Sequence, residues 1–222
     1  MLASQPQSSS TYTVNKLSQR ENIRIENIAR GIDPYGVVEQ DLDVKKLEVA
    51  LALNNNSSFV AKQHIVCSNL VLGLLKRKFL VPLVLTRNLP DALVSLVDQY
   101  SLPNSAKEGA YFPKSLDSYD IERKCDYFIY FHMHWHLKFF ISWIRYDEFP
   151  KVWLRFEDFK ENNQAYFDQI TSILGIEKIN IEASVSKDIL SDDIISKIRV
   201  NRGIKGRGRK ILNARQLELI KK

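Results

Sequence analysis

The chain has 222 residues, a formal net charge of +6 and a pI near 9.2. Its hydrophobic fraction of 45% is ordinary for a folded protein, so a disordered or fibrous chain is excluded. The length is sufficient for one α/β domain with a sizeable core. The basic balance suits an anionic partner, such as a nucleotide or a nucleic acid, without choosing between them.

The compartment is indicated by three features of the sequence. Cys67 and Cys125 form no CxxC pair and have no metal-ligand spacing, so we expect reduced thiols in a cytoplasmic protein. Residues 1–13 lack a basic segment followed by an apolar one, so no signal peptide is expected. The longest apolar run, residues 79–85, is too short to span a bilayer, so we expect no membrane partner.

Short apolar segments alternate with helical patterns along the chain. Strands are predicted at residues 1–4, 59–61, 80–86 and 152–156, of which the third has the near-continuous apolar run of a strand buried on both faces. Apolar spacing predicts helices that begin near Val14 and that cover residues 41–53, 90–100, 125–146, 166–174 and 189–198. This alternation predicts a three-layer αβα fold with a central parallel sheet. Neither an internal repeat nor a linker is evident, so we expect a single domain, residues 1–222.

The helix predicted at residues 166–174 has a clear apolar face. Its spacing places Tyr166, Phe167, Ile170, Ile173 and Leu174 toward the core. Gly175 follows directly and is expected to end the helix in the left-handed conformation.

A hydroxyl-rich loop, residues 6–12 (PQSSSTY), lies between the first predicted strand and its helix. A helix N-terminus presents free amide groups and positive partial charge, so it attracts phosphate. Serine clusters also open many helices simply as caps, and this simpler interpretation stays open for the loop alone. The pattern GxxxxGKS/T is absent, so an ordinary P-loop nucleotidase is not indicated.

An arginine follows the most apolar predicted strand. Arg87 stands at the carboxyl end of that strand, and Ser95 lies eight residues later on the next predicted helix. Ligands of open α/β sheets bind at the carboxyl ends of strands. A guanidinium there is suited to phosphate, although a surface arginine with an Asn88 helix cap is the alternative.

Together these segments resemble the PAPS-dependent sulfotransferase family, where PAPS is 3′-phosphoadenosine 5′-phosphosulfate. The family's first loop reads P-K/R-S-G-S/T-T-W/Y, and residues 6–12 match it in part. Its R-N-P-x-D-x-x-x-S segment is similar to residues 87–95 (RNLPDALVS), and its K-T-H segment is similar to residues 62–64 (KQH). Residues 156–159 (FEDF) resemble Y/F-E-D-L/F/M. The basic tail, residues 199–215, resembles the loop that covers the nucleotide in small bacterial-type members. The likeness runs in order from residue 2 to about residue 217.

The resemblance implies the P-loop nucleoside-triphosphate-hydrolase-like sulfotransferase fold and a set of site residues. PAPS would be the co-substrate and adenosine 3′,5′-bisphosphate the product, with no metal. His64 would be the general base, and Gln7 would stand at the loop position that assists transfer. The implied nucleotide-binding residues are Gln7, Ser8, Ser9, Ser10, Thr11, Tyr12, Arg87, Ser95, Phe156, Arg202 and Gly203.

Two loop residues depart from the family pattern. Gln7 stands where the family has lysine or arginine, and Ser9 stands where it has glycine.

Three hypotheses for the function are kept. The first is a sulfotransferase that acts on a hydroxyl or amine of a carbohydrate or small molecule. The second is a non-catalytic protein that binds a 3′-phosphoadenosine nucleotide. The third is a basic nucleic-acid-binding protein, which we expect least.

Three histidines lie close together at residues 132–136 (HMHWH). In one continuous helix only His132 and His136 would share a face, and no HExxH pattern is completed. The aromatic residues around them are expected to form core and pocket wall. We therefore expect no metal site here.

Overall fold

The computed structural model describes residues 1–20, 22–28, 42–53, 58–101, 114–181 and 204–221. Its strands are β1 (Leu2–Ser4), β2 (Ile23–Ile25), β3 (Ser58–Val60), β4 (Lys62–Gln63), β5 (Leu83–Thr86) and β6 (Val152–Arg155). Its helices are α1 (Ser10–Ser18), α2 (Val44–Ala52), α3 (Asn69–Arg77), α4 (Leu89–Tyr100), η1 (Lys114–Ser118), α5 (Ile121–Phe131), α6 (Met133–Arg145), α7 (Phe156–Glu161), α8 (Asn163–Leu174), α10 (Gly208–Ile211) and α11 (Ala214–Lys221).

A parallel four-stranded sheet forms the centre of the molecule, in the order β4-β1-β5-β6. β1 lies between β4 and β5, and all four residues of β5 are buried. Strands that are buried on both faces read as continuous apolar runs, as β5 does. Because the strands are parallel, the residues that follow β1, β4 and β5 come together at one edge of the sheet.

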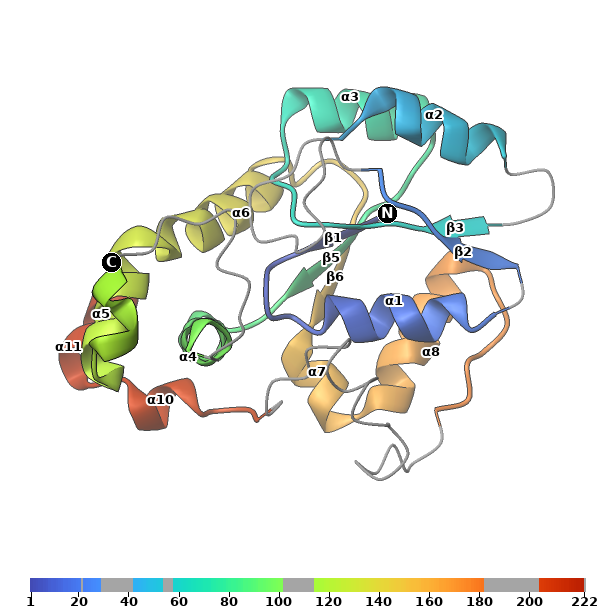
Figure 1. Cartoon of the computed structure of the whole chain (residues 1–222). Helices are drawn as coiled ribbons and strands as arrows, with labels where there is room; N and C mark the ends of the chain where they lie inside the picture. Colours follow the sequence, from blue (N-terminus) through green and yellow to red (C-terminus); the bar gives the residue numbers. More distant parts are fainter. Residues whose placement is uncertain (21, 29–41, 54–57, 102–113, 182–203, 222) are drawn as a thin grey trace.

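Helices cover both faces of this sheet (Figure 1). α2, α3 and α6 pack on one face, where Ala3 and Val84 point into their core cluster. α1 and α8 pack on the other face around Leu2, Leu85 and Leu154. The predicted three-layer αβα fold with a central parallel sheet is confirmed.

A second, two-stranded parallel sheet pairs β2 with β3, from Ile23 opposite Ser58 to Ile25 opposite Val60. The strand predicted at residues 59–61 therefore belongs to this small sheet. The central sheet instead uses Lys62 and Gln63, the residues directly after it. The sequence did not distinguish the two because one short extended segment supplies strands to both sheets.

The single helix predicted over residues 125–146 is wrong. The segment forms two helices that meet at His132, whose backbone (φ −119°, ψ −23°) ends α5 and begins α6. The break lets Cys125 and Phe128 of α5 join a third core cluster with α4 and α11, while Phe139 and Trp143 of α6 join the first. An unbroken helix could not bury both aromatic groups in these two places.

Two other helices also differ from expectation. On α8, Thr171 is buried with Tyr166, Phe167 and Ile170, whereas Ile173 and Leu174 are exposed at 43% each, so their predicted core positions are wrong. Gly175 ends this helix with φ 64°, as predicted. α3 was not predicted, and the helix predicted at residues 189–198 lies outside the described residues. No helix in the described part of the chain has both the length and the hydropathy that a bilayer span requires.

Candidate functional site: the loop after β1 and Arg87

The loop between β1 and α1 is tied to the neighbouring strand. The Gln5 amide donates to the Leu85 carbonyl at 2.9 Å, which extends the β1–β5 pairing by one residue. The Ser8 hydroxyl donates to the Gln5 carbonyl at 2.6 Å and closes the turn. The loop therefore begins at the edge of the sheet where β1 and β5 end.

The loop backbone is left-handed at Gln7 (φ 66°) and at Ser9 (φ 65°). Glycine adopts this conformation easily, but for other residues it costs roughly 1–2 kcal/mol. Ser9 is also the residue that precedes α1, and its side chain makes no capping hydrogen bond. The serine cluster is therefore not a simple helix cap at this position, and the chain accepts strain to hold the loop in this shape.

Arg87 lies beside this loop at the end of β5, and it is 6% exposed. Its amide donates to Gln5 Oε1 at 2.7 Å, and its Nη1 donates to the Gln7 carbonyl at 3.0 Å. The guanidinium stands 4.1 Å from the centre of the Phe156 ring, and its Nη2 donates to the Ile204 carbonyl at 3.3 Å. Its Nε is buried without a hydrogen-bond partner in the described structure. The cation is thus held by neutral groups and keeps an unused donor.

The charge on Arg87 is partly balanced by two carboxylates. Burial lowers the pKa of Arg87 from its ordinary value, while Asp91 and Glu157 act in the opposite direction. Glu157 Oε1 accepts from the Asn88 amide at 3.0 Å and from Asn88 Nδ2 at 2.7 Å, which fixes the start of α4 against α7. Arg87 remains a guanidinium cation, as arginine does in proteins.

Gln7 links the loop to α4. Its Oε1 accepts from the Ser95 hydroxyl at 3.0 Å, and its Nε2 donates to Gln99 Oε1. Ser95 and Arg87 are therefore both in contact with the same loop residue. The structure brings together Gln7, Arg87 and Ser95, as the sequence predicted.

His64 lies at the end of β4, beside the residue that precedes the loop. Its Nδ1 lies 2.8 Å from the Ser4 carbonyl and 3.2 Å from the Ser4 hydroxyl. A carbonyl only accepts, so Nδ1 carries the hydrogen and Nε2 is the accepting nitrogen of the neutral ring. The rings of Trp135 and His64 pack edge to face, with their centres 6.4 Å apart. This is the tautomer that a general base needs.

Gln5 joins α6 to this edge of the sheet. Its Oε1 accepts from Arg87, so its Nε2 is the donor to His136 Nδ1 at 3.0 Å. Complete burial lowers the pKa of His136 to about 3, helped by His132 and His134. His136 is therefore a neutral acceptor that fixes the Gln5 carboxamide.

The segment after residue 203 is fastened to α4 through Asp91. The amides of Gly206 and Gly208 donate to its two carboxylate oxygens at 2.7 and 2.6 Å. Burial raises the pKa of Asp91, but hydrogen bonds from Asn88, Gly208 and Gly206 outweigh it and hold the pKa below its usual value. Arg202 and Gly203 lie outside the described residues.

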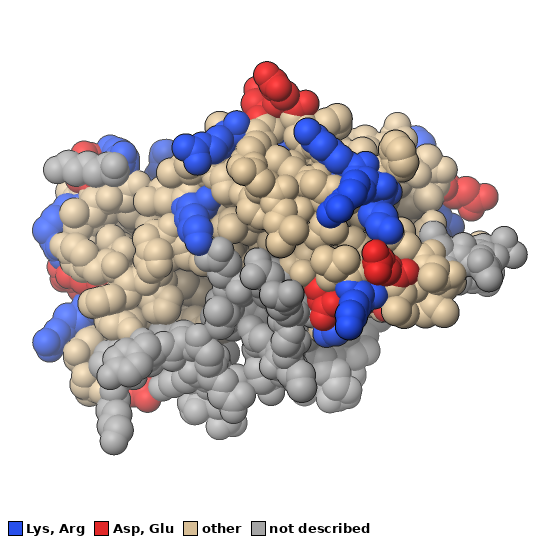
Figure 2. All heavy atoms as spheres, turned by 90° about the horizontal axis from the view of Figure 1, so that it is seen from above, with Lys and Arg blue, Asp and Glu red and all other residues tan. Residues whose placement is uncertain are grey.

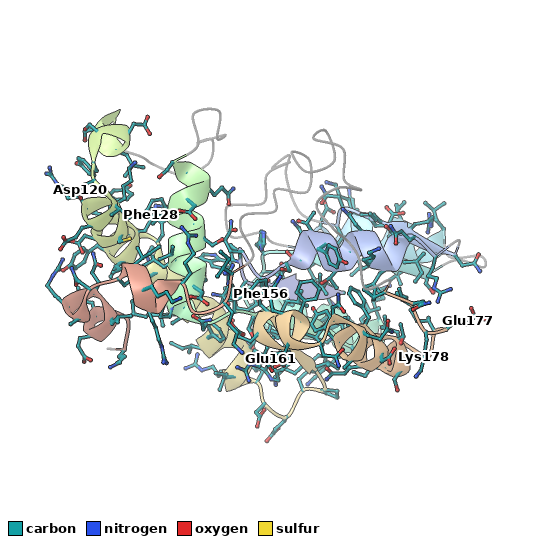
Figure 3. All side chains as sticks on the ribbon, turned by 90° about the horizontal axis from the view of Figure 1, so that it is seen from below. Asp120, Phe128, Phe156, Glu161, Glu177 and Lys178 are labelled. Atoms are coloured by element: carbon teal, nitrogen blue, oxygen red, sulfur yellow. The ribbon has the colours of Figure 1, made fainter. Side chains whose placement is uncertain are left out.

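The remaining predicted residues lie around the loop. Ser10 is buried at the first position of α1, next to Thr11. Tyr12 packs against Phe159 and Phe167, with ring centres 5.2 and 6.2 Å away. Phe156 is buried under Arg87 and lies at the start of α7, between the parts of the molecule that carry Phe128 and Glu177 (Figure 3).

Sequence reasoning missed three members of this site. Lys62 donates through Nζ to Thr11 Oγ1 at 3.2 Å, which places a cation at the start of α1. Gln5 and Asp91 organise Arg87 and the final segment, as described above. Lys62 and Asp91 lie inside residues 62–64 and 87–95, the two segments that resemble family motifs, so the sequence contained a signal for them. Gln5 had none, because its partners are 82 and 131 residues away.

The three histidines of residues 132–136 have different surroundings in the described structure. His132 lies at the break between α5 and α6, and His136 is bonded to Gln5. In the part of the chain that the structure describes, no three His, Cys, Asp or Glu side chains come together as metal ligands.

Comparison with known proteins gives one informative result. No family model matches the chain, and no curated protein matches it in sequence. Among solved structures, the chain is similar to mouse sulfotransferase SULT7A1 complexed with PAP, with a TM-score of 0.63 and 14% sequence identity. The match covers 98% of this chain and 79% of that one. The chain therefore has the sulfotransferase fold.

Proposed function

We propose that the chain is a PAPS-dependent sulfotransferase that acts on a hydroxyl or amine of a carbohydrate or small molecule. The observation that carries the proposal is the contact between the loop after β1, Arg87 and Ser95 at one edge of the sheet. The resemblance implies a phosphate at each of these elements, and the fold is shared with a sulfotransferase crystallised with PAP. Two buried free thiols, Cys67 and Cys125, fit a reducing compartment such as the cytoplasm.

Arg87 would hold the 3′-phosphate of the nucleotide together with Ser95. Its present acceptors are two neutral carbonyls, and its Nε has none. A phosphate dianion is a stronger acceptor than a carbonyl and can take two guanidinium bonds at once. The residues present therefore fit this group, with Arg202 and Gly203 as further proposed contacts.

The start of α1 would hold the 5′-phosphosulfate. Its first amides, with Ser8, Ser9, Ser10 and Thr11, supply donors and positive partial charge. Lys62 adds a full charge through its contact with Thr11. We propose that Lys62 supplies charge stabilisation that Gln7 cannot provide.

His64 would act as the general base. In the reaction the acceptor oxygen bonds to sulfur while the bond from sulfur to the phosphate oxygen breaks. The acceptor's proton passes to Nε2 of His64, and adenosine 3′,5′-bisphosphate leaves. The bond from Nδ1 to the Ser4 carbonyl holds the ring in the tautomer that can take this proton.

A non-catalytic nucleotide-binding protein is the second candidate, and Gln7 favours it because the side chain carries no charge. The nucleic-acid alternative has weaker support. On the face seen in Figure 2, lysine and arginine side chains stand in separate groups, with acidic side chains near several of them. A continuous basic band, typical of proteins that follow a phosphate backbone, is not visible there.

The test is nucleotide selectivity, measured as the shift of the thermal midpoint. Adenosine 3′,5′-bisphosphate, AMP and ADP are compared at equal concentration, and only the first should stabilise the protein. A ligand at about 100 times its Kd adds roughly 2.7 kcal/mol to the free energy of unfolding. Arg87→Ala should abolish the shift, and Arg123→Ala, on the remote helix α5, should retain it. No shift with any of the three would refute nucleotide binding.

A further inference from the structure

A groove runs along α6, and one of its walls begins two residues after the proposed base, His64. It has a volume of about 620 Å³ and lies between residues 66–68 and the outer face of the helix. In Figure 1 the chain that enters α3 passes the end of α6, and these residues form one wall. The lining residues are Val66, Cys67, Ser68, His134, Leu137, Lys138, Ile141, Ser142, Arg145 and Tyr146.

Hydrogen bonds hold the two walls together. The Cys67 amide donates to Ser142 Oγ at 2.9 Å, and Trp143 Nε1 donates to the Ile65 carbonyl at 3.0 Å. The Tyr146 hydroxyl donates to Asn69 Oδ1 at 2.8 Å. The groove is therefore a built feature of the fold and does not depend on loose surface side chains.

Both walls lead to the proposed catalytic centre. Val66 follows His64 by two residues, a distance of at most about 7 Å along an extended chain. On the other wall, Trp135 contacts the His64 ring, and the next residue, His136, is bonded to Gln5. Neither His64 nor Trp135 is among the described lining residues, so a ligand would have to extend past the end of the groove to reach the base.

The lining indicates the chemistry of the ligand. Val66, Leu137 and Ile141 make one apolar strip, and Ile141 is 62% exposed although it is aliphatic. The basic side chains of α6 that line the groove are His134, Lys138 and Arg145, and no aspartate or glutamate is among the described lining residues. From residue 134 to residue 145 the helix rises about 16 Å. An elongated apolar molecule with an acidic group matches both the strip and the charge.

We propose that this groove binds the acceptor, and that the acceptor is an anionic amphiphile whose hydroxyl reaches His64 while its acidic group lies near Lys138 and Arg145. This inference rests on the proposed sulfotransferase function, because only a transferase would have an acceptor substrate. The binding site itself can be tested without any transfer reaction.

The probe is a long-chain ω-hydroxy fatty acid, and the matching α,ω-diol is the uncharged control. Calorimetry should give the acid a Kd at least tenfold lower than that of the diol. Ile141→Glu places a negative charge in the groove and should raise the Kd of the acid at least tenfold. The matched control is Ile144→Glu, which changes an equally exposed isoleucine of the same helix outside the groove and should leave the Kd unchanged.

The outcomes separate the two proposals. If adenosine 3′,5′-bisphosphate stabilises the protein but the acid does not bind, or binds equally to Ile141→Glu, the groove proposal is wrong and the sulfotransferase proposal stands. If the acid binds as expected but the nucleotide does not, the acceptor role is overturned. Equal losses in Ile141→Glu and Ile144→Glu would show a nonspecific effect of charge on α6 and would also overturn the site.

Discussion

At the scale of single residues, Gln7 is the loop residue that separates the two proposed functions, sulfuryl transfer and nucleotide binding alone. Both ends of its carboxamide are hydrogen-bonded, because Oε1 accepts from Ser95 and Nε2 donates to Gln99. It therefore supports the geometry between the loop and α4. In the proposed reaction it would add no charge near the transferred group, where a fixed cation would stabilise the transition state.

We predict that Gln7→Lys increases sulfuryl transfer by roughly tenfold to a hundredfold, because a lost charge-stabilising group typically costs that much or more. The acceptor need not be known, since release of sulfate from labelled PAPS to water can be measured. Gln7→Met has a similar length without donor or charge, and it should lower the rate. Intact nucleotide binding with no gain in Gln7→Lys would support the non-catalytic candidate.

The sequence could predict residues whose roles depend on spacing along one segment. The eight residues from Arg87 to Ser95 put both groups on the same side of the helix start, and in the structure both side chains contact Gln7. It could not predict the carboxamide of Gln5 or its bond to His136, because these depend on how distant segments fold together. The break at His132 was missed for the same reason.

At the scale of elements, the contact between α10 and α4 holds the final segment over Arg87. Gly208 makes this possible, because a Cβ at this position would lie 2.3 Å from the Pro90 carbonyl carbon. Asp91 then receives the amides of Gly206 and Gly208. Arg207 forms an ion pair with Asp98, about two turns further along α4. The parallel sheet was predictable from the apolar runs in the sequence. The packing of α10 on α4 was not, because it depends on one close backbone contact between Gly208 and Pro90.

We predict that Gly208→Ala weakens binding of adenosine 3′,5′-bisphosphate about tenfold and lowers the free energy of unfolding by about 1–3 kcal/mol, as overpacking usually does. The added methyl group forces α10 away from Pro90, so the Ile204 carbonyl also moves away from Arg87. Calorimetry and denaturant unfolding measure the two effects.

The control is Gly73→Ala. Its Cβ meets no atom within 4 Å inside α3, so this change should leave binding unchanged and stabilise the helix by about 0.5–1 kcal/mol. Unchanged nucleotide affinity in Gly208→Ala would show that the final segment does not contribute to the site.

At the scale of the whole molecule, buried hydrogen bonds link helix α6 to the residues that follow the two central strands β1 and β5. His136 of α6, Gln5 after β1 and Arg87 after β5 form a continuous chain of hydrogen bonds. Gln5 and Arg87 directly follow neighbouring strands, and His136 lies on a helix that covers one face of the sheet. Loss of Gln5, the middle residue, would therefore affect both the packing of α6 and the position of the Arg87 backbone.

This connection predicts how stability depends on pH. Burial lowers the pKa of His136 to about 3 in the folded protein, whereas histidine in an unfolded chain has a pKa of about 6.5. Above about pH 6.5 both states are neutral at this residue, and its contribution is fully present. As the pH falls from 6.5 toward 3, only the unfolded chain takes up the proton, so the free energy of unfolding should fall by up to about 1.4 kcal/mol per pH unit from this group. His132, whose pKa burial lowers to about 4, acts in the same direction.

Urea unfolding at pH 7, 6, 5 and 4 measures this slope. His136→Gln keeps a side chain that can accept from Gln5 but cannot take up a proton, so its slope should be smaller than that of the wild type by about 1.4 kcal/mol per pH unit. Ile144→Gln is the matched control, since it places glutamine at an exposed position of the same helix and removes no titratable group, so the pH dependence should stay that of the wild type. If His136→Gln and wild type lose stability in parallel between pH 6 and pH 4, His136 is protonated in the folded protein and cannot be the neutral acceptor that fixes Gln5.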